Sequence, residues 1–299
     1  MKILVSGSHG LVGSSLVPAL SAKGHQVARL VRSLAAAAGS EIAWDPEGGR
    51  LDAAHLAGFD AVVHLAGEGI ADKRWSPEQK RRIRESRTHG TRLLAEAMAS
   101  LASPPRTLVS ASAIGYYGDR GDEMLTEESP AGTGFLPEVC KAWEVAAEPA
   151  ARKGIRVVAM RFGIILSPAG GALAKMLPPF RMGVGGRLGS GRQFMSWISL
   201  DDTLGAILHA LEFSALRGAV NVVAPRPVTN RQFTRTLGRV LRRPTVLPMP
   251  AVAVHLMFGE MGDTLLLSST RVQPKKLLAA NYPFMHPELE TALGHLLPG

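Results

Sequence analysis

Short, nearly continuous apolar runs alternate with longer helical patterns over the first half of the chain. Runs of this kind are typical of parallel strands that are buried on both faces. We expect strands at residues 2–6, 26–32, 41–44, 60–65, 107–110 and 156–162. Helical patterns separate them, most clearly at residues 10–24, 77–101 and 136–148. The repetition predicts an α/β fold, a Rossmann-type doubly wound parallel sheet covered by helices on both faces.

The pattern loosens after Gly163. Residues 170–197 are rich in Gly, Met and Pro and hold at most one helix, whereas a helix is expected at 199–212 and a strand at 219–224. We therefore divide the chain into a nucleotide-binding Rossmann domain, residues 1–165, and a smaller C-terminal substrate-side lobe, residues 166–299. About residues 198–225 of the lobe are expected to return to the main sheet. One large α/β domain is the alternative for a chain of this length.

Helix-capping residues and prolines predict where several helices begin and end. One helix is predicted to begin with Ser76 as its N-cap and Pro77 as its first residue, and Gln79 is expected to close a capping box with Ser76. Residues 229–232 form a second capping box, which opens a helix to about residue 241. Pro149 is expected to stop or kink the helix before it.

A glycine-rich turn joins the first strand to the first helix. Gly7 allows a sharp turn, Gly10 leaves room for a pyrophosphate, and Gly13 lets the helix lie close to the sheet. Phosphates would meet the free N–H groups at the start of that helix. The whole turn is therefore predicted to bind a dinucleotide: Gly7, Ser8, His9, Gly10, Leu11, Val12 and Gly13.

The end of the second strand indicates which dinucleotide binds. Sites for NAD usually carry an acidic residue there, which binds the ribose 2′-hydroxyl. This strand ends instead at Arg32 and Ser33. A guanidinium can bind a 2′-phosphate through two charge-assisted hydrogen bonds, and the serine can add a hydroxyl donor. We therefore predict NADP(H), the alternative being that Arg32 is only a solvated residue.

Composition limits the classes of protein and site. The single cysteine, Cys140, excludes an internal disulfide and a cysteine-rich metal site, and no metal site is predicted. It also suits a reducing, cytoplasmic location. No apolar stretch approaches the length of about 20 residues that a membrane-spanning helix needs, so no membrane partner is expected.

The net charge of +9 raises the question of a nucleic-acid partner. The basic residues cluster at 73–74, 80–92 and 235–243, mostly on predicted helices. No recognised nucleic-acid motif accompanies them, so we interpret them as solvated helix faces and expect no nucleic acid.

Several motifs resemble those of the extended short-chain dehydrogenase/reductase family. They are the Gly7–Gly10–Gly13 turn, Leu65–Ala66–Gly67 and Ser110–Ala111–Ser112. The chain is more closely similar to an atypical branch, the NAD-dependent epimerase/dehydratase-like "epimerase family". Its pattern covers essentially the whole chain: residues 66–68, 86–87, 141–144, 161–163, 185–193, 196–198, 221–225, 243–244, 259–260 and 274–277. The resemblance implies an NADP-binding Rossmann fold in which Leu65, Ala66 and Gly67 border the cofactor. Glu68 follows the same strand and is expected to contact a ribose of the cofactor or a bound substrate, the alternative being a solvated loop residue.

The same resemblance implies an active site with one residue replaced. The parent family uses a Tyr-x-x-x-Lys pair, whose lysine also holds the nicotinamide ribose, and a serine that binds the substrate oxygen. Ser112 fits the serine and Lys141 the lysine, but Pro137 stands where the tyrosine belongs. Possible proton donors are Tyr116, Tyr117, Glu138 and Glu68. We favour Tyr117, the alternative being a packed structural tyrosine.

Further residues are candidates for the site, and three of them, Arg161, Trp197 and Cys140, have two possible roles each. Arg161 either faces the nicotinamide pocket or an acidic substrate, or forms a salt bridge with Glu144 or Glu148. Gln193 and Trp197 are candidates, with Tyr116, for the substrate side, although a Trp in an apolar stretch is more often a core residue. Cys140 either has a lowered pKa beside Lys141 or is a small core residue.

Two functional hypotheses follow. One is an NADP(H)-dependent oxidoreductase or epimerase-type enzyme acting on a small carbonyl or hydroxyl substrate. The other is an NADP(H)-sensing protein that has lost its proton relay, as Pro137 suggests. The identity of the substrate, the direction of reaction and the oligomeric state stay open at this point.

Overall fold

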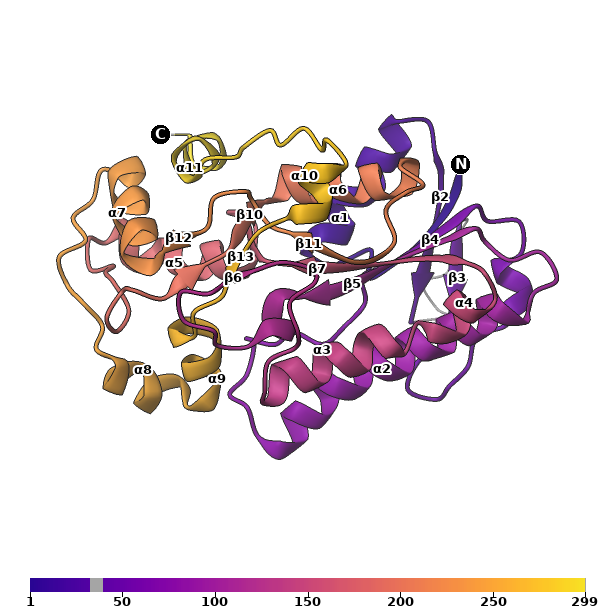
Figure 1. Cartoon of the computed structure of the whole chain (residues 1–299), viewed down its shortest axis with the longest axis horizontal. Helices are drawn as coiled ribbons and strands as arrows, with labels where there is room; N and C mark the ends of the chain where they lie inside the picture. Colours follow the sequence, from indigo (N-terminus) through magenta and orange to yellow (C-terminus); the bar gives the residue numbers. More distant parts are fainter. Residues whose placement is uncertain (33–39, 299) are drawn as a thin grey trace.

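The computed structural model, which describes residues 1–32 and 40–298, contains a sheet of seven parallel strands (Figure 1). Their order is β11-β7-β5-β4-β1-β2-β3. The strands are β1 (Lys2–Ser6), β2 (Gln26–Val31), β3 (Glu41–Ala43), β4 (Ala61–His64), β5 (Thr107–Ala113), β7 (Arg156–Phe162) and β11 (Gly218–Val222). All six neighbouring pairs are parallel. The predicted Rossmann-type doubly wound sheet is confirmed.

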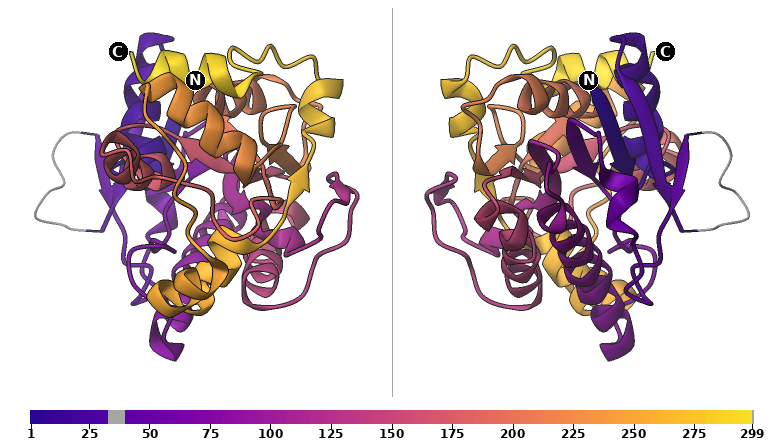
Figure 2. Two further views of the ribbon diagram at one scale, coloured as in Figure 1. Left: turned by 90° about the vertical axis from the view of Figure 1, so that its left-hand side faces the viewer. Right: turned by 90° about the vertical axis from the view of Figure 1, so that its right-hand side faces the viewer.

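Helices cover both faces of this sheet, as the two end-on views in Figure 2 show. One face carries α1 (Leu11–Ala22) and α6 (Leu200–Glu212), and the other carries α2 (Pro77–Ser100), α3 (Phe135–Val145) and α4 (Glu148–Arg152). Strand side chains alternate between the two cores. Val5 packs in the core shared with α1 and α6, whereas Leu4 packs in the core shared with α2 and α4.

The helix boundaries follow local capping chemistry. The Ser76 hydroxyl accepts a hydrogen bond from the Gln79 amide, so Ser76 is the N-cap of α2, as expected. The Gln79 side chain, however, donates to Glu68 instead of closing the capping box. The prediction for Pro149 was wrong, because α3 ends earlier and Pro149 lies in the first turn of α4, where its missing N–H costs nothing.

The C-terminal part of the chain encloses a separate core. Leu173 and Leu177 of α5 (Gly171–Arg181), Phe233 and Leu237 of α7 (Asn230–Leu241), and Leu293 of α11 (Leu289–Leu296) pack together there. Two short strand pairs contribute to this core: β8 (Ile164–Leu166) with β10 (Trp197–Ser199), and β9 (Phe194–Met195) with β12 (Val228–Thr229). A third pair, β6 (Met124–Leu125) with β13 (Arg271–Val272), packs against Tyr117 instead. In the described part of the chain, the remaining elements are α8 (Ala251–Phe258), α9 (Glu260–Gly262), α10 (Lys275–Ala279), 3₁₀ turns at Ala53–Leu56 and Ile114–Tyr117, and a π turn at Asp263–Leu267.

Strand β11 returns from this part of the chain to the main sheet. It pairs with β7 and sets Asn221 opposite Arg161. The carboxyl ends of β5, β7 and β11 therefore meet at one edge of the sheet.

Within the described ranges, no helix has the length and apolar character needed to cross a membrane.

Candidate functional site

The glycine turn after β1 is a close contact between backbones. Gly7 has a φ of +68°, and a Cβ on it would lie 2.7 Å from the carbonyl carbon of Leu65. A Cβ on Gly13 would lie 2.2 Å from the Gly7 oxygen. Gly10 differs, because it is extended and its Cβ would meet only the Gly7 oxygen, at 3.4 Å. The space over Gly10 is therefore open for a ligand that approaches the backbone and the N-terminus of α1.

This turn lies between β2 and β4, where the strand order reverses and where doubly wound sheets bind ligands. Ser8 is buried, and His9 is exposed with its Nδ1 3.4 Å from the Ser8 hydroxyl. Val12 packs against the core, and Leu11 contacts the start of α5.

The other residues predicted to bind the nucleotide lie after β4 and β2, the two strands on either side of β1. Ala66 and Gly67 follow β4, and Ala66 lies against Gly7. Arg32 is exposed directly after β2, on the neighbouring strand, and Ser33 lies outside the described residues.

At the end of β5, Ser112 belongs to a buried ionic network. Its hydroxyl donates to Oε1 of Glu144 at 2.7 Å. Arg161 holds the same carboxylate through Nε at 2.7 Å and Nη2 at 2.8 Å. Burial opposes the charge of Arg161, but its hydrogen bonds and attraction to Glu144 outweigh burial and raise the pKa of Arg161. The guanidinium of Arg161 thus forms the ion pair with Glu144 that was the alternative for this residue, and its contact with the cofactor stays a prediction.

Tyr117 continues this network toward β11. Its side chain has no exposed surface, and its hydroxyl donates to Asn221 Oδ1 at 2.7 Å and accepts from Arg161 Nη1 at 3.0 Å. Burial raises the pKa of Tyr117, and Arg161 offsets only part of that rise. This position does not support Tyr117 as the proton donor and is that of a packed structural tyrosine. The Tyr116 ring lies 3.4 Å from Arg161 Cζ, in cation–π geometry.

Helix α3 turns Cys140 into the interior, where its sulfur would lie 3.7 Å from a Cβ on Gly115, just after β5. Pro137 is buried against Gly118, whereas Lys141 is exposed. The expected role of Lys141 beside Ser112 is therefore not supported. Burial raises the pKa of the Cys140 thiol to about 12, so the thiol is a neutral core group and not a reactive one.

Arg87, on α2, was assigned no role from the sequence. Its guanidinium carbon would lie 3.5 Å from a Cβ on Gly67, and 5.0 Å from the centre of the Trp143 ring. Nη1 donates to the Ile83 carbonyl at 3.0 Å. A partly buried cation therefore lies against the end of β4, beside the glycine turn. The signal was present, because Arg87 interrupts the buried positions Ile83, Gly90 and Leu94 of this helix.

A line of buried polar groups connects β1, β4, α2 and α3. His64 Nδ1 lies 2.6 Å from the Ser6 hydroxyl, and His64 Nε2 lies 3.0 Å from the Thr91 hydroxyl. Thr91 also accepts from the Trp143 indole at 2.9 Å. Burial lowers the pKa of His64 to about 4, so the imidazole is neutral at physiological pH. This line orients Trp143, on which the Arg87 guanidinium packs.

The remaining candidates lie apart from this constellation. Gln193 is buried and its amide donates to the carbonyls of Leu188 and Leu266, which it braces. Trp197 is fully buried in the core of the C-terminal part. For both, the structure gives packing contacts in place of the expected substrate-facing surface. Glu68 is half-buried, and its backbone N–H donates a hydrogen bond to the Ser86 hydroxyl. Glu138 is exposed and forms an ion pair with Arg84.

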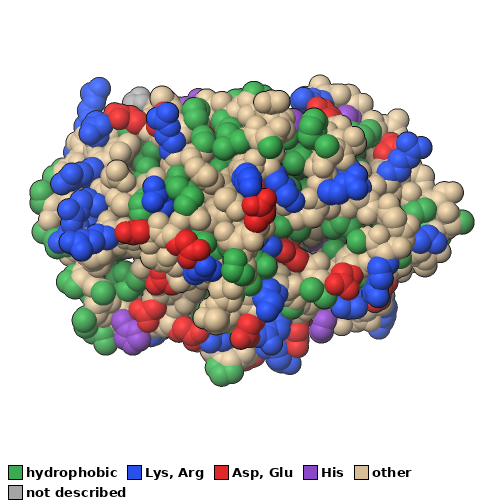
Figure 3. All heavy atoms as spheres, viewed as in Figure 1, with side chains coloured by type: hydrophobic (Ala, Val, Ile, Leu, Met, Phe, Trp, Pro, Cys, Tyr) green, Lys and Arg blue, Asp and Glu red, His purple; other side chains and the backbone are tan. Residues whose placement is uncertain are grey.

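Charges of both signs are interspersed over most of the face in Figure 3, and basic side chains gather at the end that carries α7. Several arginines of α2 and α7 are paired with acidic residues: Arg82 with Glu78, Arg92 with Glu96, and Arg239 with Glu290.

Residues 3–223 match the model of the NAD dependent epimerase/dehydratase family, and residues 249–296 match a domain of unknown function, DUF1731. The chain is 46% identical to epimerase family protein Mb2239 of Mycobacterium bovis over 293 residues, 98% of this chain and 96% of that protein.

Two solved structures are similar over 99% of this chain. The crystal structure of human epimerase family protein SDR39U1 with NADPH has a TM-score of 0.92 and 35% identity, with 99% of that chain covered. The nucleoside-diphosphate sugar epimerase from Corynebacterium glutamicum has a TM-score of 0.81 and 36% identity, with 58% of that chain covered.

Proposed function

The chain belongs to the NAD dependent epimerase/dehydratase family, and on that premise we propose that it is an NADP(H)-dependent oxidoreductase or epimerase-type enzyme. Its substrate is a small carbonyl or hydroxyl compound, and its compartment is the reducing cytosol. The observation that carries the proposal is the glycine turn. Two of its glycines are required by close backbone contacts, whereas a Cβ on Gly10 would meet, among the described atoms, only the Gly7 oxygen at 3.4 Å, so the space over Gly10 is left to a ligand.

The residues present fit a dinucleotide. The N–H groups at the start of α1 and the Ser8 hydroxyl would hold the pyrophosphate, and Arg32 would pair with the 2′-phosphate. The NADPH in the similar human structure supports this choice of cofactor. When bound, the cofactor supplies or accepts hydride.

The chain's own groups would orient the substrate and balance its charge. Ser112 donates to the substrate oxygen in place of its present acceptor, Glu144, and so stabilises the charge that develops there. Arg87 supplies the positive charge beside the cofactor that Lys141, exposed on α3, is not placed to give. A water molecule is then the proton donor, because the Tyr117 hydroxyl is buried and already bonded.

The hydroxyl-bearing substrate class has one further support. The similar protein from C. glutamicum is described as a nucleoside-diphosphate sugar epimerase, which acts on a compound with several hydroxyl groups. We therefore place nucleotide sugars beside simple aldehydes and ketones among the substrates to be tested.

An NADP(H)-sensing protein without turnover is the second candidate. The observation in its favour is that the Tyr-x-x-x-Lys pair is replaced by a buried Pro137 and an exposed Lys141. This candidate keeps the nucleotide site and predicts ligand-dependent stability without oxidation of NADPH by any substrate.

Thermal unfolding with NADPH and with NADH at equal concentration tests the cofactor proposal first. A ligand at about one hundred times its Kd adds about 2.7 kcal/mol to stability. A clear rise with NADPH and a smaller one with NADH is expected. No rise with either would overturn both candidates, whereas a rise without turnover of any substrate would favour the sensor.

A further inference from the structure

A cluster of two imidazoles and one carboxylate lies outside the site described above. Its members are Asp201, in the first turn of α6, His286, in the loop before α11, and His295, in the last turn of α11. One ligand atom from each residue lies within 4.8 Å of the other two. We propose that these three residues bind a Zn²⁺ ion.

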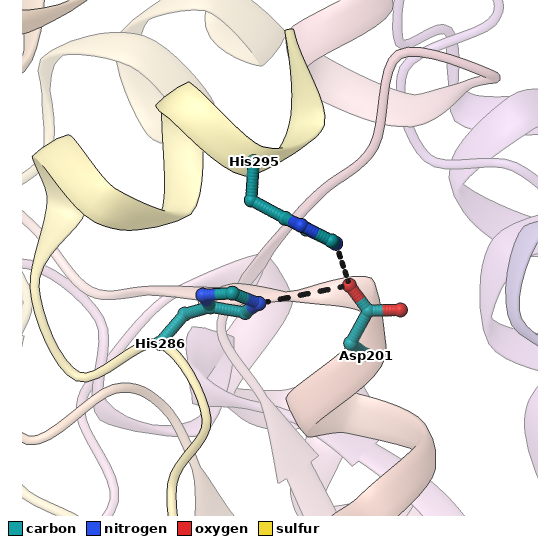
Figure 4. A group of neighbouring side chains, drawn as sticks. All are labelled: Asp201, His286 and His295. Carbon is teal, nitrogen blue, oxygen red and sulfur yellow. Dashed lines mark hydrogen bonds and ion pairs between the residues drawn. The ribbon is translucent and has the colours of Figure 1, made fainter. Parts of the chain in front are cut away.

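The separations are close to those that zinc requires. His295 Nε2 lies 3.1 Å and His286 Nε2 lies 3.9 Å from the same Asp201 oxygen, Oδ2. Around a tetrahedral Zn²⁺ with bonds of about 2.0–2.1 Å, ligand atoms lie about 3.3 Å apart. Figure 4 shows both rings directed at the carboxylate from one side. Small side-chain rotations would therefore complete the site.

The backbone that carries two of the ligands is held rigidly. The carboxylate of Asp202, which is fully buried, accepts from the backbone amides of Met285 at 2.7 Å and His286 at 2.9 Å. Tyr282 also donates to the Asp202 carbonyl at 2.9 Å. The loop with His286 is thus fixed to the start of α6, one residue after Asp201. Such support of the ligand-bearing backbone favours metal binding.

The third ligand arrives on a packed helix. Leu289 and Leu293 of α11 are buried in the core with Leu237 of α7, which sets the exposed His295 over Asp201. The two rings stack with centroids 4.5 Å apart. Two imidazoles and a carboxylate favour Zn²⁺ over Mg²⁺ or Ca²⁺, which prefer oxygen ligands.

The fourth position of the ion would face solvent, because 55% of the His295 side chain and 38% of the Asp201 side chain are exposed. A water molecule would occupy it. Since the ligands come from α6 and from the last part of the chain, the ion would fasten α11 to the helix layer of the main sheet. Zn²⁺ is therefore expected to raise the unfolding temperature by a few degrees when it is in excess.

The test uses the full chain without a polyhistidine tag, stripped with a chelator and titrated with ZnCl₂ by calorimetry. The wild type, His295→Gln, Asp201→Asn and a control, His255→Gln, are compared. His255 is a matched imidazole because it is also exposed and paired with a single carboxylate, Asp263, at 2.7 Å. CoCl₂ is added in a parallel titration, because the visible spectrum of Co²⁺ reports tetrahedral coordination independently of stability.

We expect the wild type and His255→Gln to bind about one Zn²⁺ and to give a tetrahedral Co²⁺ spectrum. Both site variants should bind more than about tenfold more weakly and lose that spectrum. Equal affinity in all four proteins, equal weakening in the control, or wild-type binding only at millimolar Zn²⁺ would overturn the proposal.

Discussion

Arg161 and Glu144 face each other through two charge-assisted hydrogen bonds, and their side chains are only 4% and 18% exposed. Arg161 is on β7 and Glu144 on α3, so the pair links the sheet to the helix where the parent family keeps its catalytic residues. Ser112 and Tyr117 both depend on it for their orientation. The pair thus holds the Ser112 hydroxyl, which in our proposal turns from Glu144 to the substrate oxygen.

Removing one partner of this pair leaves a buried charge without compensation. Glu144→Gln is therefore expected to lower the free energy of unfolding by about 3–5 kcal/mol. Denaturant unfolding measures this change. The matched control on the same helix is Glu138→Gln, because the pair Glu138–Arg84 is 64% and 48% exposed. The control should lower the free energy of unfolding by only about 0–1 kcal/mol. Equal losses in the two variants would contradict the prediction that the buried pair contributes more than an exposed pair.

Tyr117 and Tyr116 allow the structural role of one hydroxyl to be isolated. Tyr117→Phe leaves Asn221 Oδ1 without its donor, so we expect a loss of about 1–3 kcal/mol in stability. Affinity for NADPH should be unchanged. Tyr116→Phe keeps the ring over which Arg161 lies and should be nearly neutral. Unfolding and turnover measured together are decisive, since abolished turnover in a stable Tyr117→Phe protein would restore Tyr117 as proton donor.

Substitutions at Gly10 and Gly13 are expected to have different effects, the first on affinity for NADPH and the second on stability. Gly10→Ala is sterically allowed but fills the space over the turn, so NADPH affinity should fall at least about tenfold, or about 1.4 kcal/mol, with little change in stability. Gly13→Ala sets a Cβ 2.2 Å from a backbone oxygen and should cost about 1–3 kcal/mol of stability or more. Gly294→Ala, inside helix α11 with no described atom within 4 Å of its Cβ, is the control: it should gain about 0.5–1 kcal/mol of stability from helix propensity and bind NADPH as the wild type does. Unchanged NADPH affinity in Gly10→Ala would exclude the turn as the phosphate site.

Arg87→Met tests the cation beside the cofactor. A lost charge-assisted hydrogen bond of about 1.5–3 kcal/mol predicts an NADPH affinity that is weaker by tenfold or more. Arg87→Lys should recover part of it, because the charge remains. Arg82→Met, on the same helix with an exposed partner, should bind NADPH as the wild type does. If calorimetry gives the same Kd for Arg87→Met and Arg82→Met, then Arg87 only packs on Trp143.

His64 predicts a dependence of stability on pH. Its pKa is about 4 in the folded chain and 6.5 as a free side chain, so between these values the unfolded chain binds more protons. Stability from this group is therefore complete above pH 6.5 and decreases as the pH falls toward 4, by about 3 kcal/mol in total. His64→Gln should remove this part of the pH dependence, and the exposed His89→Gln should not. Parallel profiles for the wild type and His64→Gln would contradict the assignment.

The order of elements could be predicted from the sequence because it depends on local signals. Strands on a doubly covered sheet are apolar throughout, and the capping residues Ser76 and Thr229 act over one helical turn. The glycine turn could be interpreted for the same reason, since each glycine responds to neighbouring backbone. Pro149 was misinterpreted because a proline that ends one helix and one that begins the next have the same sequence signal.

The catalytic candidates could not be placed from the sequence, because their roles depend on the rotation of α3. A rotation of α3 by about 100°, the angle between successive helical residues, would exchange Cys140 for Lys141 at the end of β5, and a pattern of 11 residues did not fix this angle in advance. The Tyr117–Asn221 bond joins residues 104 positions apart. Arg87 was detectable in principle, as a cation among the buried positions of α2, but its contact with Gly67 depends on how α2 lies on the sheet.

The return of β11 to the sheet limits how this protein can diversify. The chain passes from the sheet to the C-terminal core, comes back for β11, and then leaves again for α7 and α11. A single crossover between genes would therefore divide the sheet or the C-terminal core, and neither could be exchanged as a module. New substrate preferences must then arise by point substitutions and by changes in loop length within an otherwise indivisible chain.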